Sequence, residues 1–246
     1  MKQNIVVFGA TSAICTALLR LYAKEGASLF LAARNNEKLA ALGEDLVVRG
    51  ATVAGMRAYD FNDWPQHEGC LEEAATALGE VDLVIVAHGS LPQQADCDAS
   101  GEVTWNTLQD NFSSTAIILQ QSARLLAAQG RGTLAAFTSV AGDRGRKSNY
   151  TYGSTKAGLD AMLEGLRGRF YGSPVAVVTI KPGMIVSPMT ADMEHGPLWS
   201  TPEAIAPTIK TAISRGRALC YAPGYWRLIM WVIRALPLAV LARLPI

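Results

Sequence analysis

The stretch Ile5-Val-Val-Phe-Gly-Ala-Thr-Ser-Ala-Ile-Cys15 decides the fold. Ile5 to Phe8 is a continuous apolar run with two adjacent valines, which is typical of a strand covered on both faces. A turn of small residues follows, and Thr16 to Glu25 carries apolar residues at helical spacing. A strand, a small-residue turn and a helix together present backbone N–H groups and a positive helix end to a phosphate. The strict Gly-x-Gly-x-x-Gly pattern is absent, so an ordinary tight turn is the alternative.

Further apolar runs recur along the chain, and helical patterns separate most of them. Strands are expected at residues 27–33, 52–59, 81–87, 132–138, 175–180 and 218–222. Helices are expected at 36–49, 66–78, 102–129, through 152–156 to about 171, and from a Thr-Pro-Glu cap at 201–203, with a polar loop at 91–100. This alternation predicts a doubly wound parallel sheet flanked by helices, a Rossmann-type α/β fold. No linker or repeat interrupts it, so residues 1–223 are expected to form one domain.

The end of the second expected strand bears on the choice of cofactor. Dinucleotide folds place the residue that discriminates the adenosine ribose there, and an acid at this place would bind the 2′-OH. Ala33 and Arg34 instead leave room and supply charge for a 2′-phosphate. The pattern therefore favours NADP, with NAD as the alternative. Asp60, after the third strand, could accept a hydrogen bond from an adenine amine or cap a helix.

A second informative stretch follows the strand at 132–138. Ser139 lies just after that strand, and Tyr152 and Lys156 stand four residues apart on a predicted helix. A nearby ammonium favours a phenolate, so we expect a lowered pKa for Tyr152. Such a phenol can donate a proton to a carbonyl oxygen or accept one from an alcohol. The Ser139 hydroxyl could polarise the same oxygen. Asn111, inside the long apolar helix, must find hydrogen-bond partners.

Composition excludes several other classes of function. The chain of 246 residues has a formal net charge of +1, which leaves no electrostatic footprint for nucleic acid. Its four cysteines and three histidines lack ligand-like spacing, so no metal site is expected. Scattered thiols fit a reducing compartment, and the first apolar run is too short for a secretory segment. The expected location is therefore the cytoplasm.

Residues 224–246 form an apolar tail that differs from the rest of the chain. Arg227, Arg234, Pro237 and Arg243 interrupt it, so it is a poor membrane-spanning helix. Arg227 and Arg234 are one heptad apart on one helical face, with aromatic and aliphatic residues elsewhere on the surface. Such a helix suits a membrane interface, which would hold the protein peripherally at the inner face of the membrane. Packing on a partner subunit is an equally good interpretation.

Together these motifs resemble the short-chain dehydrogenase/reductase family, up to about residue 190. The family's glycine motif is matched by residues 9–15, its adenine acid by Asp60, its Asn-Ala-Gly turn by residues 87–89, and its Pro-Gly segment by residues 182–183, with Ser187 in place of a threonine. The resemblance implies a cofactor site formed by Gly9, Thr11, Ser12, Ile14, Arg34, Asp60, Phe61, Ala87, Gly89, Tyr152, Lys156, Pro182, Gly183 and Ile185.

The resemblance also implies a catalytic set, Asn111, Ser139, Tyr152 and Lys156. In the family the tyrosine donates the proton, the lysine lowers its pKa and holds the nicotinamide ribose, and the serine binds the substrate oxygen. The asparagine holds a water that links the lysine to solvent. Family members are usually homodimers or homotetramers.

This chain departs from the family pattern in two places. Ala13 and Cys15 replace the second and third glycines of the glycine motif, so we expect altered cofactor affinity rather than lost binding. His88 replaces the alanine of the Asn-Ala-Gly turn, next to the expected adenine pocket.

Several stretches, including the tail, resemble one branch of the family. That branch comprises the keto-reductase subunits of decaprenylphosphoryl-ribose 2′-epimerase, in which a flavin oxidase partner makes a 2-keto sugar on a polyprenyl phosphate. The resemblance implies a lipid-linked sugar as substrate, which would explain the tail physically. A soluble carbonyl reductase, for example of the 3-oxoacyl type, and a non-catalytic nucleotide-binding subunit are the alternatives.

Overall fold

The computed structural model describes residues 2–244, and its centre is a seven-stranded parallel sheet. Its strands, in the spatial order β3-β2-β1-β4-β5-β6-β9, are β3 Thr52–Ala58, β2 Ser28–Ala33, β1 Asn4–Phe8, β4 Leu83–Val86, β5 Gly132–Phe137, β6 Val175–Pro182 and β9 Leu219–Ala222. The predicted doubly wound parallel sheet is confirmed. The first residue of the predicted domain and the last two of the predicted tail lie outside the described residues.

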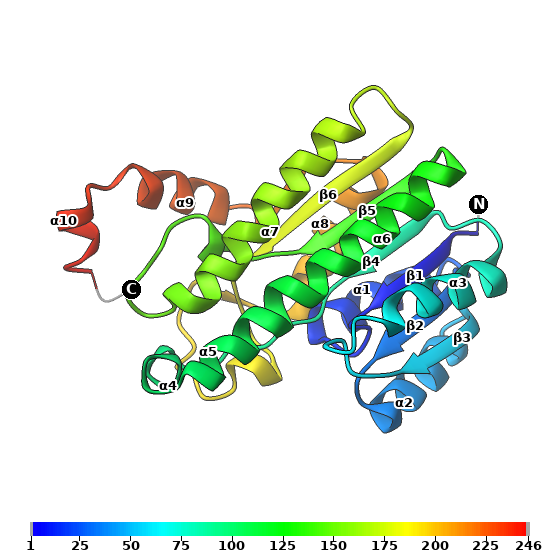
Figure 1. The fold of residues 1–246 in the computed structure, drawn as a ribbon, viewed down its shortest axis with the longest axis horizontal. Coiled ribbons are helices and arrows are strands. Elements are labelled where there is room, and N and C mark those ends of the chain that lie inside the picture. The colour runs from blue at the N-terminus through cyan, green and yellow to red at the C-terminus, as the bar shows by residue number, and fades with distance from the viewer. Residues whose placement is uncertain (1, 245–246) are drawn as a thin grey trace.

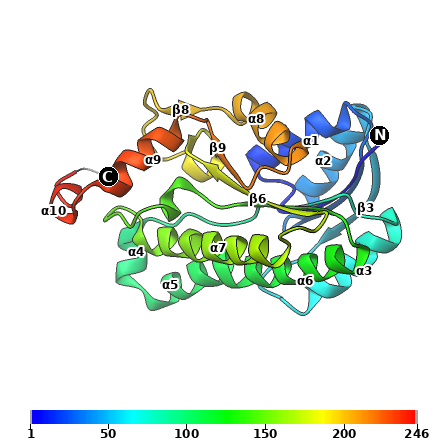
Figure 2. The same ribbon diagram turned by 90° about the horizontal axis from the view of Figure 1, so that it is seen from above.

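Helices cover both faces of the sheet (Figures 1 and 2). One layer contains α1 Ala13–Ala23, α2 Asn36–Val48 and α8 Pro202–Ser214, and the other contains α3 Gln66–Leu78, α6 Ser114–Gln129 and α7 Tyr150–Arg169. Two more helices, α4 Gln94–Ala99 and α5 Gly101–Leu108, lead into α6. The last two, α9 Trp226–Ala235 and α10 Leu238–Leu241, project beyond the end of the sheet. None of these described helices is long and apolar enough to cross a membrane.

The strands are apolar throughout because both faces of the sheet are covered. In β1, Ile5 and Val7 point into the core beneath α1 and α8, whereas Val6 and Phe8 point into the core beneath α3, α6 and α7. All four side chains are fully buried. The continuous apolar run that predicted the first strand therefore reflects two cores, one on each side of the sheet.

The structure differs from the sequence predictions in three places. The expected polar loop at 91–100 contains α4, and Ser100 then caps α5 by accepting a hydrogen bond from the Val103 amide (3.3 Å). The expected single helix at 102–129 is divided by a π-helical turn at Gln109–Ser113, where the side-chain amide of Asn111 donates to the Thr107 carbonyl (3.0 Å). A small sheet of β7 Met184–Ile185 and β8 Trp199–Ser200 was not predicted.

The strand order reverses between β1 and β4, because the chain first winds outward through β2 and β3 and then returns. A crevice forms at such a switch point, outside the carboxyl ends of the strands. The loops after β1, β4, β5 and β6 all open at this edge, so the fold brings the predicted site residues to one side of the sheet.

Candidate active site

The turn between β1 and α1 is built to receive a phosphate. Gly9 has a φ of +80°, and a Cβ there would lie 2.5 Å from the backbone nitrogen of His88, so only glycine fits. Ser12 caps α1 and accepts a hydrogen bond from the Cys15 amide (3.3 Å). The amides of Thr11, Ala13 and Ile14 have no acceptor among the described residues. Free N–H groups at a helix N-terminus are the arrangement that binds a diphosphate.

The two departures from the glycine motif do not block this turn. The Cys15 side chain is fully buried in the core beneath α1, away from the cleft. Ala13 lines the cavity with only a methyl group. The replacement of two glycines is therefore sterically compatible with a phosphate at the helix end.

A single cavity of about 670 Å³ runs from this turn to the end of β5 and on to α9. Every predicted site residue except Asp60 lines this cavity. These residues, from both the catalytic and the cofactor-binding predictions, are Gly9, Thr11, Ser12, Ile14, Arg34, Phe61, Ala87, Gly89, Asn111, Ser139, Tyr152, Lys156, Pro182, Gly183 and Ile185. The structure thus brings together residues that are up to 176 positions apart (185 minus 9) in the chain. Their individual roles stay predictions.

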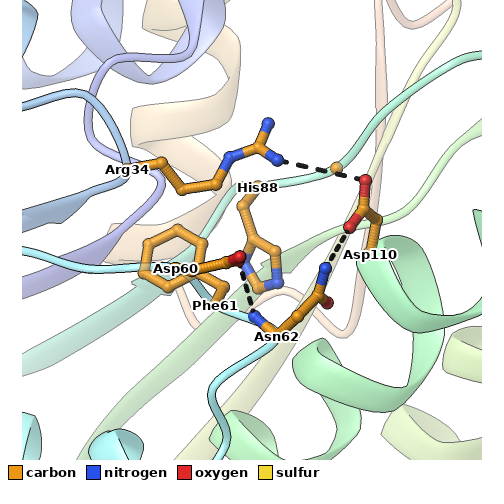
Figure 3. Close-up of a pocket in the computed structure, with 7 residues that line it drawn as sticks. Arg34, Asp60, Phe61, Asn62, His88 and Asp110 are labelled. Atoms are coloured by element: carbon orange, nitrogen blue, oxygen red, sulfur yellow. Dashed lines mark hydrogen bonds and ion pairs between the residues drawn. The ribbon is translucent and has the colours of Figure 1, made fainter. Parts of the chain in front are cut away.

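Asp60 lies in a small adjoining pocket at the end of the cavity nearest β2 (Figure 3). Its carboxylate accepts a hydrogen bond from the Asn62 amide (2.9 Å), and the Asn62 side chain donates to Asp110 (2.7 Å). Arg34 reaches across the same pocket, with its Nη1 4.0 Å from the Asp110 carboxylate. The guanidinium is half exposed, so it is available to a group that enters the main cavity.

His88 forms a wall between the small pocket and the core, which explains how the site accommodates it in place of alanine. Its ring packs on Phe61 with 4.6 Å between ring centroids. Its Nε2 is 2.9 Å from the Ser114 hydroxyl and 3.1 Å from that of Thr115. Burial, reinforced by the nearby positive charge of Lys156, lowers the pKa of His88 to about 3, so the ring is neutral. His88 is therefore part of the wall and not an acid–base group at neutral pH.

Ser139, Tyr152 and Lys156 meet where β5 ends and α7 begins. The Ser139 hydroxyl accepts a hydrogen bond from the Ala141 amide (3.1 Å), which fixes the turn after β5. Helix α7 begins at Tyr150, so Tyr152 lies in its first turn and Lys156 one turn later. The Lys156 Nζ lies 5.4 Å from the centroid of the Tyr152 ring. Lys156 is 3% exposed, so a charged amine is held inside the protein.

The electrostatics of this pair differ from the prediction. Burial raises the pKa of Tyr152 to about 12, and the hydrogen bond of Ser139 and the charge of Arg146 offset only part of that increase. Burial also lowers the pKa of Lys156 to about 8. The prediction of a more acidic phenol is wrong because desolvation outweighs the nearby charge. The phenol is therefore protonated over the physiological range.

Asn111 is placed by the π-helical turn and points toward the same end of the cavity. Its Oδ1 accepts a hydrogen bond from the Ser90 amide (3.1 Å), and its Nδ2 donates to the Ser90 hydroxyl (3.2 Å). A Cβ at Gly89 would lie 2.5 Å from Asn111 Oδ1 and 3.3 Å from Lys156 Nζ. Asn111 and Lys156 therefore converge on one backbone position after β4, while their catalytic roles stay predictions.

A buried ion cluster behind Lys156 was missed from the sequence. Lys181, in β6, forms ion pairs with Asp143 and with Asp160, whose Oδ2 is 2.7 Å from its Nζ. The Tyr221 hydroxyl donates to the other oxygen of Asp143 (2.7 Å). Asp160 is also the carboxylate that favours the charged form of Lys156. The cluster thus links four parts of the chain next to the site: α7, β6, β9 and the loop that follows β5.

The far wall of the cavity is apolar and was also missed. Trp226, at the start of α9, is 2% exposed and stacks so closely on the backbone that a Cβ at Gly183 would lie 1.9 Å from its Nε1. The rest of this wall comes from the segment after β6, where Met184, Met189, Met193 and Trp199 supply the large apolar side chains and Ser187 and Thr190 also line the cavity. Nothing in the spacing of these residues predicted that they would meet. Within residues 2–244, no group of histidine, cysteine and acidic side chains could hold a metal ion.

Comparisons with known proteins identify the family of this chain. The model of the family described as short chain dehydrogenase matches residues 3–197. An uncharacterized oxidoreductase of Mycobacterium tuberculosis strain H37Rv is 32% identical over 241 residues, covering 98% of this chain and 96% of that protein. An uncharacterized oxidoreductase of Streptomyces coelicolor is 34% identical over 243 residues, with the same coverages of 98% and 96%.

Two solved structures share the fold. Actinorhodin polyketide ketoreductase, crystallised as a variant with NADPH, superimposes with a TM-score of 0.79 at 20% identity, covering 90% of this chain and 97% of that one. A protein described as a dehydrogenase from Burkholderia cenocepacia, with bound NADP, gives a TM-score of 0.80 at 14% identity and coverages of 91% and 93%. At these identities the likeness shows the fold alone.

Proposed function

The chain belongs to the short-chain dehydrogenase family, and from that membership we propose that it is an NADPH-dependent reductase that converts a ketone into an alcohol. One observation carries the proposal: a single cavity joins the phosphate-accepting turn at Gly9 to the Ser139, Tyr152 and Lys156 side chains. A cofactor and a carbonyl compound can therefore meet in one enclosed space. The alternative of a non-catalytic nucleotide-binding subunit has less support, because the proton-donating set is complete.

The residues along the cavity fit a dinucleotide. The free amides at the start of α1 would hold the diphosphate, and Arg34 and Lys38 would meet the adenosine ribose. Both side chains are cationic, which supports NADP over NAD because the 2′-phosphate needs positive charge. When bound, the reduced nicotinamide supplies the hydride. The chain itself supplies orientation and the proton.

The proton comes from Tyr152 in this proposal. Its raised pKa keeps the hydroxyl protonated, and the alkoxide that develops from a ketone is a stronger base than a phenolate. The Ser139 hydroxyl donates a second hydrogen bond to the same oxygen. Lys156, with Asn111 beside it, is placed to return a proton to the phenolate after each turnover. Burial of Tyr152 and Lys156 keeps competing water away from the transfer.

We propose further that the ketone is the 2-keto group of a sugar carried on a polyprenyl phosphate, supplied by a flavin oxidase partner. The apolar wall formed by Met184, Trp199 and Trp226 supports an apolar substrate portion, and the sequence resemblance of the tail supports this branch. A 3-oxoacyl thioester is the second candidate, because the same wall would suit an acyl chain.

The test is a comparison of ketone substrates. Consumption of NADPH is followed with a 2-keto pentose on a short polyprenyl phosphate, with the same keto sugar lacking the lipid, and with a 3-oxoacyl thioester. Turnover of the lipid-linked sugar well above the other two supports the proposal. A preference for the thioester would assign a 3-oxoacyl substrate in place of the lipid-linked sugar. Nucleotide binding without turnover of any ketone would overturn the proposal that the protein is a reductase.

We also propose that α9 rests on an anionic membrane surface. Leu228 and Trp231 are 68% and 69% exposed on the face of α9 that turns away from the cavity. Arg227 and Arg234 flank them and are exposed. An exposed apolar face bordered by arginines is the charge pattern that complements an anionic lipid headgroup region. This position would bring a lipid-linked substrate to the cavity from the membrane side, at the inner face.

Replacing both Leu228 and Trp231 by serine is expected to weaken binding to vesicles containing phosphatidylglycerol roughly tenfold or more, because the apolar area that enters the lipid is lost. Cosedimentation measures this effect. Tyr171→Ser, which removes an even more exposed aromatic (92% exposed) elsewhere on the molecule, is the control and should bind normally. Unchanged vesicle binding in the double variant contradicts the proposal. A change in assembly mass instead would assign α9 to contacts within a homodimer or homotetramer.

A further inference from the structure

The cavity contains more positive charge than the cofactor requires. Its lining includes Arg34, Lys38, Arg146 and Lys156, but no aspartate or glutamate from the described residues. Arg34 and Lys38 lie at the adenosine end, and Lys156 belongs to the proton-donating set. Arg146 lies in the loop between β5 and α7, and neither the cofactor site nor the proton transfer uses it.

Arg146 is a half-buried cation without a counter-ion among the described residues. It follows Gly145 in the loop between β5 and α7, and its Nε is inaccessible to solvent without a hydrogen-bond partner among residues 2–244. No ion pair to Arg146 occurs in the described structure. Asp143 is the nearest acid in the loop, but its two oxygens are engaged by Lys181 and the Tyr221 hydroxyl. An unpaired charge in such surroundings is costly unless a ligand completes it.

Arg146 also shares the cavity with the proton-donating set. Arg146, Ser148, Asn149 and Tyr152 all line it. The positive charge of Arg146 acts on the Tyr152 hydroxyl, where it partly offsets the effect of burial on the phenol pKa. A substrate whose carbonyl accepts the proton of Tyr152 can therefore present a second group to Arg146 within the same cavity.

We propose that Arg146 binds an oxyanion of the substrate, so that this enzyme reduces ketones that combine a negatively charged group with an apolar portion. The planar guanidinium offers paired N–H donors that match a phosphate or carboxylate. The methionines and tryptophans that line the same cavity accept the apolar portion. This inference rests on the proposed reductase function but names a binding site that can be tested without turnover.

The experiment measures the binding of three probes that share one chain: dodecyl phosphate, dodecanoate and dodecanol. Titration calorimetry is done with NADP⁺ at saturation, so that the phosphate site at α1 is filled. We expect at least one anionic probe to bind roughly 10- to 100-fold more tightly than dodecanol, since a hydrogen-bonded charge pair contributes that much. A preference for the phosphate or for the carboxylate probe then identifies which anionic group of the substrate Arg146 binds.

Arg146→Gln is expected to remove this preference, and Arg146→Lys to retain part of it, because a point charge lacks the guanidinium fork. Arg144→Gln is the matched control: it lies in the same loop, but its guanidinium donates to the Leu236 carbonyl (3.3 Å) and does not line the cavity. Equal affinity of the wild-type protein for all three probes overturns the proposal, as does an equal loss in the Arg144 variant. Failure to bind NADP⁺ would count against the reductase function and not against the anion site.

Discussion

Tyr152→Phe is expected to lower turnover of any accepted ketone roughly 100- to 10,000-fold, the range for the loss of a general acid. The phenylalanine keeps the ring that packs beneath Lys156, so only the proton is removed. NADPH affinity should stay within about twofold, because the amides at α1 and the cations at Arg34 and Lys38 supply most of the binding. Steady-state kinetics and a fluorescence titration of the cofactor measure the two quantities separately.

Tyr150→Phe is the matched control for this prediction. Tyr150 lies one half-turn earlier in α7, is 49% exposed and donates its hydroxyl proton to Asp98 on the surface. Its loss removes a solvent-exposed hydrogen bond, so turnover should change by less than about threefold. Activity near the wild-type level in Tyr152→Phe would exclude the tyrosine as the proton donor, and an equal loss in both variants would indicate a disturbed α7.

Lys181→Met is expected to lower the free energy of unfolding by about 3–5 kcal/mol, because it leaves Asp143 and Asp160 as like charges without the ammonium that pairs with both. Only 9% of the Lys181 side chain and 2% of the Asp143 side chain are exposed, so water cannot replace the missing ammonium. For a domain of this size the loss corresponds to a fall in Tm of roughly 6–20 °C. Thermal unfolding followed by circular dichroism measures it.

The control for this prediction is Arg124→Met, which breaks the surface pair with Glu68. Their side chains are 63% and 57% exposed, and such pairs contribute about 0–1 kcal/mol. Adding Asp143→Asn and Asp160→Asn to Lys181→Met should recover part of the stability, since the uncompensated charges are then removed. A fall in Tm no larger than that of the control would show that the cluster contributes nothing to the stability of the sheet.

The fold could be predicted from the sequence because the main strands are buried on both faces. Their residues are therefore apolar without interruption, and the runs at 5–8, 27–33 and 81–87 stand out in the sequence. The helical stretches that were predicted incorrectly, around α4 and the π-helical turn, are half-exposed segments with mixed polarity. In these segments caps such as Ser100 and the side chain of Asn111 decide the local conformation.

The candidate site could be predicted in part, because Ser139, Tyr152 and Lys156 lie close in the chain and match a family motif. The direction of the Tyr152 pKa could not, since it depends on how deeply α7 is buried and not on the spacing of two residues. Arg146 was also missed. In the sequence it is one of several basic residues in a loop, and its lack of a partner appears only when Asp143 is seen to pair with Lys181.

The contact of Trp226 with Gly183 has a consequence for how substrate choice evolves. The segment that matches the family ends at residue 197, so Met184, Met189 and Met193 of the apolar wall lie inside it, whereas Trp199 and Trp226 lie beyond it. One part of the wall is thus encoded outside the stretch that matches the family. Changes confined to the 3′ end of the gene can reshape that part of the cavity while residues 3–197 are inherited unchanged.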